Sequence, residues 1–233
     1  MKKIILASLI LFTTVSFAQE IKYGAKAGIN VSSLRGDYPD EIDENKSKIG
    51  FHIGGFLEYS INDKLSIQPE LLYSTQGGKS VVKEEYGGGT YYESFTQTPK
   101  LSYLNIPIMF KYKVIEKLSI EFGPQIGYAL SAKSKWEYVD STDSSENETI
   151  EVDILNGGNY TYLGTDVEVK GRINKFDFGL NLGASYELTE QIFVQARYNL
   201  GLSVVDDNST AGTSTDSWNL KNSVLQFSLG YKF

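Results

Sequence analysis

LQFSLGYKF, residues 225–233, alternates large apolar side chains with Gln, Ser, Gly and Lys up to its last residue. Successive side chains of a β-strand point to opposite faces, so this period of two predicts a strand with one apolar and one polar face. All eight such segments reach the ~9–11 residues that a tilted strand needs to cross a bilayer. The other seven are residues 22–31, 49–60, 65–76, 101–113, 118–131, 173–187 and 192–204.

The connections between these segments alternate in length. The short ones are residues 61–64, 114–117 and 188–191. The long ones are polar and cover residues 32–48, 77–100, 132–172 and 206–220. An even number of strands, with tight turns at one end and long loops at the other, is typical of outer-membrane proteins. The sequence therefore predicts an all-β fold: an eight-stranded antiparallel up-and-down transmembrane β-barrel with long extracellular loops and short periplasmic turns.

Alternation alone does not separate this barrel from a soluble, lipocalin-like periplasmic lipid carrier, whose apolar face points inward. The polar phase is rich in glycine, which weakens a strand unless the face is crowded, and the inside of a narrow barrel is crowded. Aromatic residues of the apolar phase gather near the short turns and the chain ends, as in an interface girdle. This predicted girdle is Tyr23, Tyr59, Tyr112, Tyr186, Tyr231 and Phe233. A second row, near the outer interface, is predicted at Phe51, Tyr73, Tyr128 and Phe176. Both features favour the membrane barrel, and the lipid carrier remains the alternative.

The first residues have the pattern of an export signal. Lys2 and Lys3 precede an apolar run that ends near Ser16-Phe17-Ala18, where small residues resemble a signal-peptidase site. The apolar run is shorter than the ~20 residues of a membrane-spanning helix. We therefore expect a signal peptide over residues 1–18 that is cleaved, and a single barrel domain over residues 19–233 in the outer membrane.

Composition excludes several functional classes. The sequence has 22 Lys and Arg against 29 Asp and Glu, and its formal net charge of -7 argues against nucleic acid as a partner. It has no Cys, which excludes disulfides and thiolate-ligated metals. His52, the single histidine, is predicted to face inward near the outer mouth, without a converging nucleophile and acid. We therefore expect no catalytic, cofactor or metal site.

The polar phase carries charged side chains that would share the narrow lumen. We call seven of them the lumen network: Lys26, Glu58, Glu70, Lys111, Glu121, Asp177 and Arg197. Counted from the short turns, Glu70, Glu121 and Arg197 fall at similar depths. Unpaired charges are costly in so confined a space, so these groups are expected to pair and to plug the barrel. A narrow channel lined by charges is the alternative.

Three prolines lie inside predicted strands, at Pro69, Pro107 and Pro124. Each removes a ladder hydrogen bond in a closed barrel that has no edge strand to accept it. We expect a local β-bulge at each position.

Four segments together resemble a known family. They are KAGINVSSL (26–34), GFHIGGFLEYSINDKLSIQPELLYSTQGGK (50–79), LSYLNIPIMFKYK (101–113) and GPQIGYALSAK (123–133). The chain resembles the PorT-like outer-membrane β-barrel family of Bacteroidetes-type bacteria, whose namesake is linked to secretion and maturation of exported proteases. The resemblance implies an outer-membrane barrel in which the three prolines are family features, and it brings no catalytic motif. The expected partners are outer-membrane lipid and lipopolysaccharide, with a surface or secretion-system protein as a further possibility. The acidic loop at residues 133–170 lies outside the matching pattern.

Overall fold

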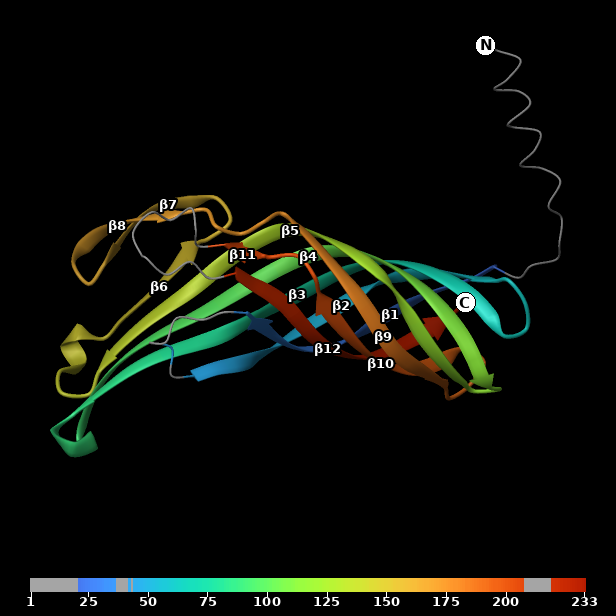
Figure 1. Ribbon diagram of the computed structural model, residues 1–233, viewed down its shortest axis with the longest axis horizontal. Helices are drawn as coiled ribbons and strands as arrows, with labels where there is room; N and C mark the ends of the chain where they lie inside the picture. Colours follow the sequence, from blue (N-terminus) through green and yellow to red (C-terminus); the bar gives the residue numbers. More distant parts are fainter. Residues whose placement is uncertain (1–20, 37–41, 43, 208–218) are drawn as a thin grey trace, which may run out of the picture.

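Eight long strands form a closed antiparallel ring, which confirms the predicted barrel (Figure 1). The computed structural model describes residues 21–36, 42, 44–207 and 219–233, so the predicted signal peptide lies outside the described residues. The ring follows chain order and closes where the first strand pairs with the last. Its strands are β1 (Ile21–Arg35), β2 (Glu44–Ser60), β3 (Leu65–Tyr86), β4 (Tyr91–Ile115), β5 (Leu118–Asp140), β9 (Phe176–Glu187), β10 (Ile192–Gly201) and β12 (Asn219–Lys232).

Much of the sequence predicted as extracellular loop is strand. Residues 77–100 continue β3 and β4 as one hairpin, in which Tyr86 pairs with Tyr91 around the short η1 helix (Gly87–Gly89). Outside the bilayer both faces of a strand can meet water, so no apolar period marks these residues. The other elements beyond the wall are η2 (Ser144–Glu146), β6 (Glu148–Asp153), β7 (Gly157–Tyr162), β8 (Thr165–Lys170) and β11 (Asp206–Asp207).

The apolar phase faces outward and the polar phase faces inward. Phe51 is 50% exposed and Leu229 58% exposed, whereas Arg197 is 1% exposed and Gln68 is completely buried. A lipocalin-like carrier would require the reverse arrangement, with its apolar side chains facing inward. The lipid-carrier alternative is therefore wrong. Within the part of the chain that the structure covers, no helix is both long and apolar enough to cross a membrane.

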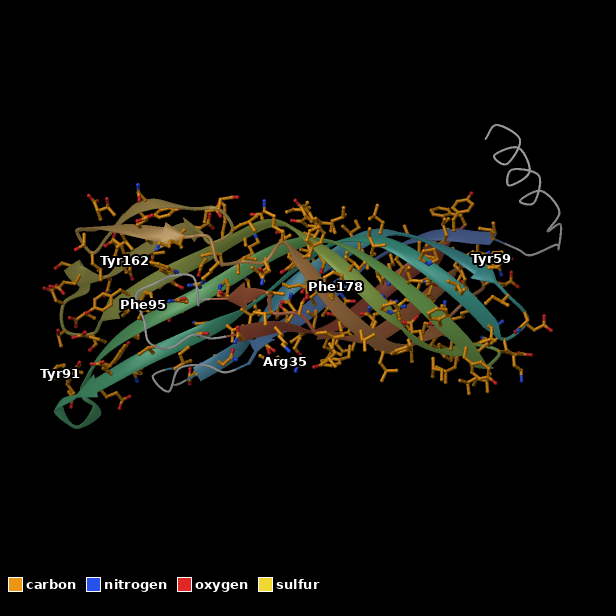
Figure 2. The ribbon with its side chains drawn as sticks, turned by 45° about the horizontal axis from the view of Figure 1, so that its top comes forward. Arg35, Tyr59, Tyr91, Phe95, Tyr162 and Phe178 are labelled. Carbon is orange, nitrogen blue, oxygen red and sulfur yellow. The ribbon has the colours of Figure 1, made fainter. Side chains whose placement is uncertain are left out.

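Aromatic side chains of the apolar phase meet at both ends of the wall. Near the periplasmic turns, the Phe233 ring lies 5.4 Å from the Tyr23 ring and 5.1 Å from the Tyr231 ring, between centroids. Tyr59 lies at this end in Figure 2, far from Tyr91 at the extracellular tip. In the predicted outer row, the ring pairs are Phe51 with Tyr73 at 5.8 Å and Tyr128 with Phe176 at 5.3 Å. That these rows anchor the barrel in the two interfaces stays a prediction.

The prolines do not produce the expected bulges. Strand register is the same on both sides of Pro69, Pro107 and Pro124, so this prediction is wrong. A residue of an antiparallel strand directs its N–H and C=O to one neighbouring strand, so a proline removes one bond and does not require an inserted residue. Register shifts occur elsewhere, at residues 47–52, 102–103 and 113–115.

Inward-facing glycines make room for inward-facing aromatic rings. A Cβ atom at Gly230 would overlap the Phe193 ring, and one at Gly24 would overlap the Phe56 ring. The two rings meet inside the lumen, edge to face, with centroids 5.6 Å apart. The expectation that the glycine-rich phase lines a crowded interior is therefore confirmed at these positions.

A second core lies at the extracellular end of the barrel, between the ends of the wall strands and the β7–β8 hairpin. We call it the outer core. Its apolar residues come from many segments, and Ile154, Val152, Leu101 and Val205 in it have no exposed surface. Figure 1 shows β6, β7 and β8 at the extracellular end of the barrel. The remaining members are Leu34, Tyr103, Ala129, Ala132, Val169, Ile173 and Leu220.

Candidate functional site: the barrel lumen

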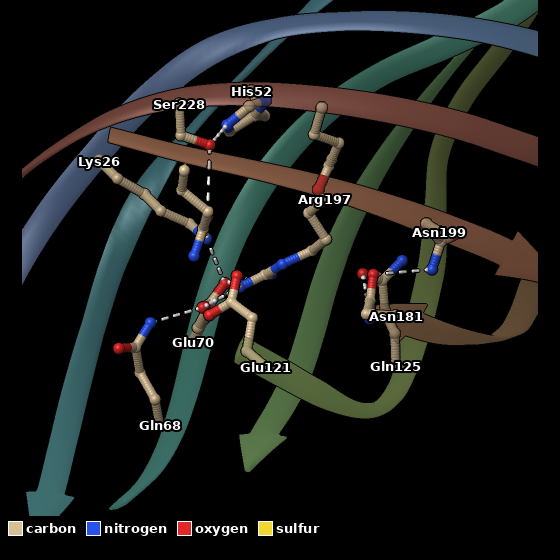
Figure 3. A network of polar contacts seen from close by, with 12 residues as sticks. Lys26, His52, Gln68, Glu70, Glu121, Gln125, Asn181, Arg197, Asn199 and Ser228 are labelled. Atoms are coloured by element: carbon tan, nitrogen blue, oxygen red, sulfur yellow. Dashed lines mark hydrogen bonds and ion pairs between the residues drawn. The ribbon is translucent and has the colours of Figure 1, made fainter. Parts of the chain in front are cut away.

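Glu70, on β3, is the carboxylate on which the central lumen contacts converge (Figure 3). It accepts two hydrogen bonds from the Arg197 guanidinium, with Nη1 at 3.0 Å and Nη2 at 2.8 Å. The Lys26 ammonium lies 2.7 Å from the second oxygen, Oε2. All three side chains are at most 3% exposed. A bidentate Arg–carboxylate pair is among the most orientation-specific polar contacts in proteins.

Glu121, on β5, completes a group of two cations and two anions. Its Oε1 lies 3.4 Å from Arg197 Nη2. We call Lys26, Glu70, Glu121 and Arg197 the central cluster; its formal charge is zero. Neutrality matters here because burying a charge without a partner costs several kcal/mol, whereas a complete set of pairs offsets that cost. The structure thus brings together four of the seven residues of the predicted lumen network.

A hydrogen-bonded chain of neutral side chains extends from the central cluster. Lys26 donates to Gln195 Oε1 at 2.8 Å, and Ser228 donates to the same oxygen at 3.4 Å. His52 Nε2 lies 2.8 Å from the Ser228 hydroxyl, and its Nδ1 lies 2.8 Å from Asn30 Oδ1. His52 therefore faces inward as predicted, but it adjoins the central cluster instead of lining the outer mouth. Both ring nitrogens of His52 make hydrogen bonds to lumen side chains, so His52 has a structural role in this chain of contacts.

A second neutral group closes the periplasmic end. Lys111 lies 3.1 Å from Glu58, Lys232 lies 3.5 Å from Glu58, and Lys232 lies 2.6 Å from Glu187. We call these four residues the periplasmic cluster. Gln68 joins it to the central cluster, because its Nε2 donates to Glu70 at 2.7 Å and its Oε1 accepts from Lys111 at 3.0 Å. A mixed-charge recess opens beneath this cluster toward the short turns.

Three of these contributors were missed in the predicted lumen network. Lys232 belongs to the polar phase of the last strand, so the signal was present in the sequence. Glu187 directly precedes a short turn, where a carboxylate could equally well point to water. Gln68 also belongs to the polar phase that is predicted to line the lumen, but it is uncharged, and nothing in the sequence marks it as the link between two charged groups.

Asp177, on β9, does not join either cluster, so the expectation that it pairs with another charge is wrong. Its carboxylate accepts hydrogen bonds from Asn222 at 2.8 Å and Ser203 at 2.9 Å. Arg197 pairs with Gly183, which is six residues farther along β9 than Asp177. At ~3.3 Å per residue, that offset places Asp177 about 20 Å along the strand from the central cluster.

The sequence has two tryptophans, Trp136 and Trp218, which lie where predicted loops meet the membrane and are therefore expected to be interface anchors. Trp136 packs against the outer core with two aromatic neighbours: its ring lies 6.0 Å from both Phe95 and Tyr162. Burial, together with the nearby Glu148 and Glu137 carboxylates, raises the pKa of Tyr162 to about 12. Trp218 lies outside the described residues.

Across residues 21–36, 42, 44–207 and 219–233, no group of three or more His, Asp or Glu side chains is arranged to hold a metal ion.

Comparison with known sequences gives one family. The family model described as Outer membrane protein beta-barrel domain matches residues 17–207, which is most of the chain. No curated protein sequence matches the chain significantly.

Several solved structures are similar to this chain at low sequence identity. Ail, the attachment invasion locus protein of Yersinia pestis, solved with the heparin analogue sucrose octasulfate, has a TM-score of 0.41 and 13% identity, and the match covers 92% of this chain and 99% of Ail. Neisserial surface protein A has a TM-score of 0.43 and 12% identity, with coverage of 91% and 97%. The outer membrane protease OmpT from Escherichia coli has a TM-score of 0.35 and 12% identity, with coverage of 95% and 99%. Likeness at this level does not indicate a shared ligand or activity.

Proposed function

Because this chain belongs to the outer membrane protein beta-barrel domain family, we propose that it is a non-enzymatic outer-membrane barrel with a plugged lumen and a surface-interaction role. The protein resides in the outer membrane, where lipid covers its apolar wall. The plug and the surface role are the two parts of the proposal, and each rests on a separate feature of the molecule.

The plug is supported by the charge pairing of the lumen side chains. Side chains of the central and periplasmic clusters are paired across the barrel and linked through Gln68. Phe56 and Phe193 fill the lumen with a pair of rings, and the Lys111 and Lys232 ammonium groups each lie 5.8 Å from the Phe193 ring centroid. An ion that enters this space would have to separate pairs that compensate each other.

The surface role is supported by the ordered architecture beyond the wall. The outer core gives the extracellular segments an apolar interior of their own, which a plug alone does not require. The β3–β4 hairpin projects past the wall and carries three exposed rings: Tyr86, Tyr91 and Tyr92. Tyrosine is enriched in protein interfaces because it offers large, rigid contact area with a polar end. Lipopolysaccharide or a surface or secretion-system protein is the proposed partner.

The plug can be tested by conductance in planar bilayers. The wild-type barrel is expected to insert without steady ion current, and a Phe56→Ala/Phe193→Ala variant is expected to conduct because its lumen has lost both rings. Phe227→Ala is the matched control, since Phe227 faces lipid and its loss leaves the lumen unchanged. Steady current through the wild type would favour the narrow-channel alternative.

The surface role can be tested by binding to purified lipopolysaccharide and to extracted surface proteins. Replacing Tyr86 and Tyr91 with Ser should weaken capture, whereas replacing Tyr59 with Ser, at the opposite end, should not. Equal capture by both variants would contradict a role for the hairpin.

The finer resemblance to PorT-like proteins remains part of this proposal. Its four segments lie mainly in β1 to β5, which form the wall and its extracellular extensions. A secretion-associated role would therefore need a contact made by that wall or by the extracellular surface, because the acidic residues 133–170 lie outside the matching pattern.

A further inference from the structure

Asp177 differs from the other buried acids of the described chain. Four Asp or Glu residues are at most 3% exposed: Glu70, Glu121, Asp177 and Asp206. An arginine nitrogen lies within 3.4 Å of Glu70, Glu121 and Asp206. Asp177 forms no ion pair among the described residues. Its two hydrogen-bond donors, Asn222 and Ser203, are neutral.

Neutral donors orient a carboxylate but do not cancel its charge. Buried charges in proteins are paired or bind metal ions, because burial without compensation strongly disfavours the ionised form. The rest of the lumen follows this rule closely, since both the central and periplasmic clusters are neutral. Asp177 is therefore the position at which a compensating charge is missing among the residues that the structure describes.

The groups beside Asp177 also lack partners. Asn105 is 1% exposed, and neither its Oδ1 nor its Nδ2 makes a hydrogen bond. Asn222 Oδ1 is likewise buried without a partner, and the buried Tyr103 hydroxyl lies beside the Asn222 side chain. Buried polar groups in proteins are nearly always satisfied by protein, water or an ion, so orphaned amide oxygens around one carboxylate call for a common explanation.

Strand register brings these groups together. Asn105 of β4 pairs with Gly127 of β5, and Gly127 pairs with Asp177 of β9. Because Gly127 has no side chain, the Asn105 and Asp177 side chains both approach the space beside its Cα atom. A Cβ atom there would lie 2.6 Å from Asn105 Oδ1, 3.3 Å from Tyr103 Cδ1 and 3.5 Å from Asp177 Cβ.

We propose that this spot binds a monovalent alkali cation, Na⁺ or K⁺, at the junction between the polar lumen and the outer core. The candidate ligands are the Asp177 carboxylate, the amide oxygens of Asn105 and Asn222, and the Tyr103 hydroxyl. Carboxylate, amide and hydroxyl oxygens are the ligands that hard cations prefer. A single carboxylate matches a single positive charge, which favours an alkali ion over Ca²⁺.

The first test is cation-dependent stability of the whole purified protein in detergent micelles. Heat unfolding is followed on gels at equal ionic strength in NaCl, KCl or choline chloride. The wild-type midpoint should rise saturably with Na⁺ or K⁺ relative to choline, because a ligand that binds only the folded state stabilises it. Asp177→Asn should lose this dependence and match or exceed the wild-type midpoint in choline. Asp166→Asn, at an exposed position on β8, is the matched control and should keep the dependence.

The second test locates the ion and does not depend on any variant. Crystals of the wild type grown with Tl⁺, an alkali-ion substitute with strong anomalous scattering, should show an anomalous peak within coordination distance of the Asp177 carboxylate. A midpoint that is equal in all three salts, or density for water only at this spot, would overturn the proposal.

Discussion

Within the barrel wall, the enclosed side chains are mostly charged groups and amides, whereas above the wall, under the β7–β8 hairpin, they are mostly aliphatic and aromatic. Arg197 and Ile154 show the contrast, since each has almost no exposed surface. The apolar side chains of the wall strands face lipid, so only their polar side chains face the lumen. The extracellular segments face water outside and can enclose apolar residues in the usual way.

The two interiors should therefore fail in different ways. A charged interior is stable only while every charge keeps its partner, so loss of one member leaves another buried and uncompensated. An apolar interior loses stability in proportion to the atoms removed and the cavity left behind. Single substitutions in each region can separate these behaviours.

Replacing Arg197 with Leu should have the largest effect. The change leaves Glu121 without a cation and Glu70 with Lys26 alone, which should lower the free energy of unfolding by about 3–5 kcal/mol. The measurement is the midpoint of heat modifiability, or of urea unfolding, in detergent micelles.

Two further variants sharpen this result. Adding Glu121→Gln to Arg197→Leu should recover part of the loss, because it removes a charge that the first change stranded. Lys133→Leu, which breaks an exposed pair with Glu151 at 2.7 Å, should leave the midpoint unchanged. Equal midpoints for wild type and Arg197→Leu would contradict a stabilising central cluster.

Replacing Ile154 with Ala should weaken the outer core by about 2–4 kcal/mol through lost burial and a cavity. Because this core lies at the extracellular end of the barrel, away from the central cluster, the barrel should keep its heat-modifiable band while residues 148–172 become sensitive to added protease. Thr149→Ala, at an exposed position on β6, is the control. A fall in the barrel midpoint as large as that of Arg197→Leu would show that the two interiors unfold as one.

Replacing Gly230 with Ala should have the smallest effect, about 1–3 kcal/mol from overpacking against Phe193. Combining it with Phe193→Leu should restore much of the loss, so the double-mutant cycle would show coupling. Gly55→Ala is the control, because a Cβ there meets its nearest atom at an ordinary 3.5 Å. Additive effects of the two changes would argue against direct crowding.

The same division explains what could be predicted from sequence. The wall could be predicted because lipid on one side and a narrow lumen on the other enforce a period of two. Depth counted from the short turns also brought Lys26, Glu70, Glu121 and Arg197 together correctly. The expected charge pairing of Asp177 is wrong, because its strand places it about 20 Å from that level at ~3.3 Å per residue.

The outer core could not be predicted. Leu34, Val205 and Leu220 each come from a different segment, and none belongs to a periodic pattern that points to the others. The sequence predicts a loop over residues 77–100 because the strands there lack a lipid-facing side. Beyond the bilayer, tertiary contacts between distant segments decide the structure, and a single sequence does not display them.

The inward and outward assignment of the wall can be measured directly, because the chain contains no cysteine. Single cysteines replacing Ser228 and Leu229, neighbours on β12, are labelled with a fluorophore and reconstituted in bilayers with brominated lipid. The account predicts strong quenching at position 229 and little at position 228. Quenching at 228 with none at 229 would contradict it.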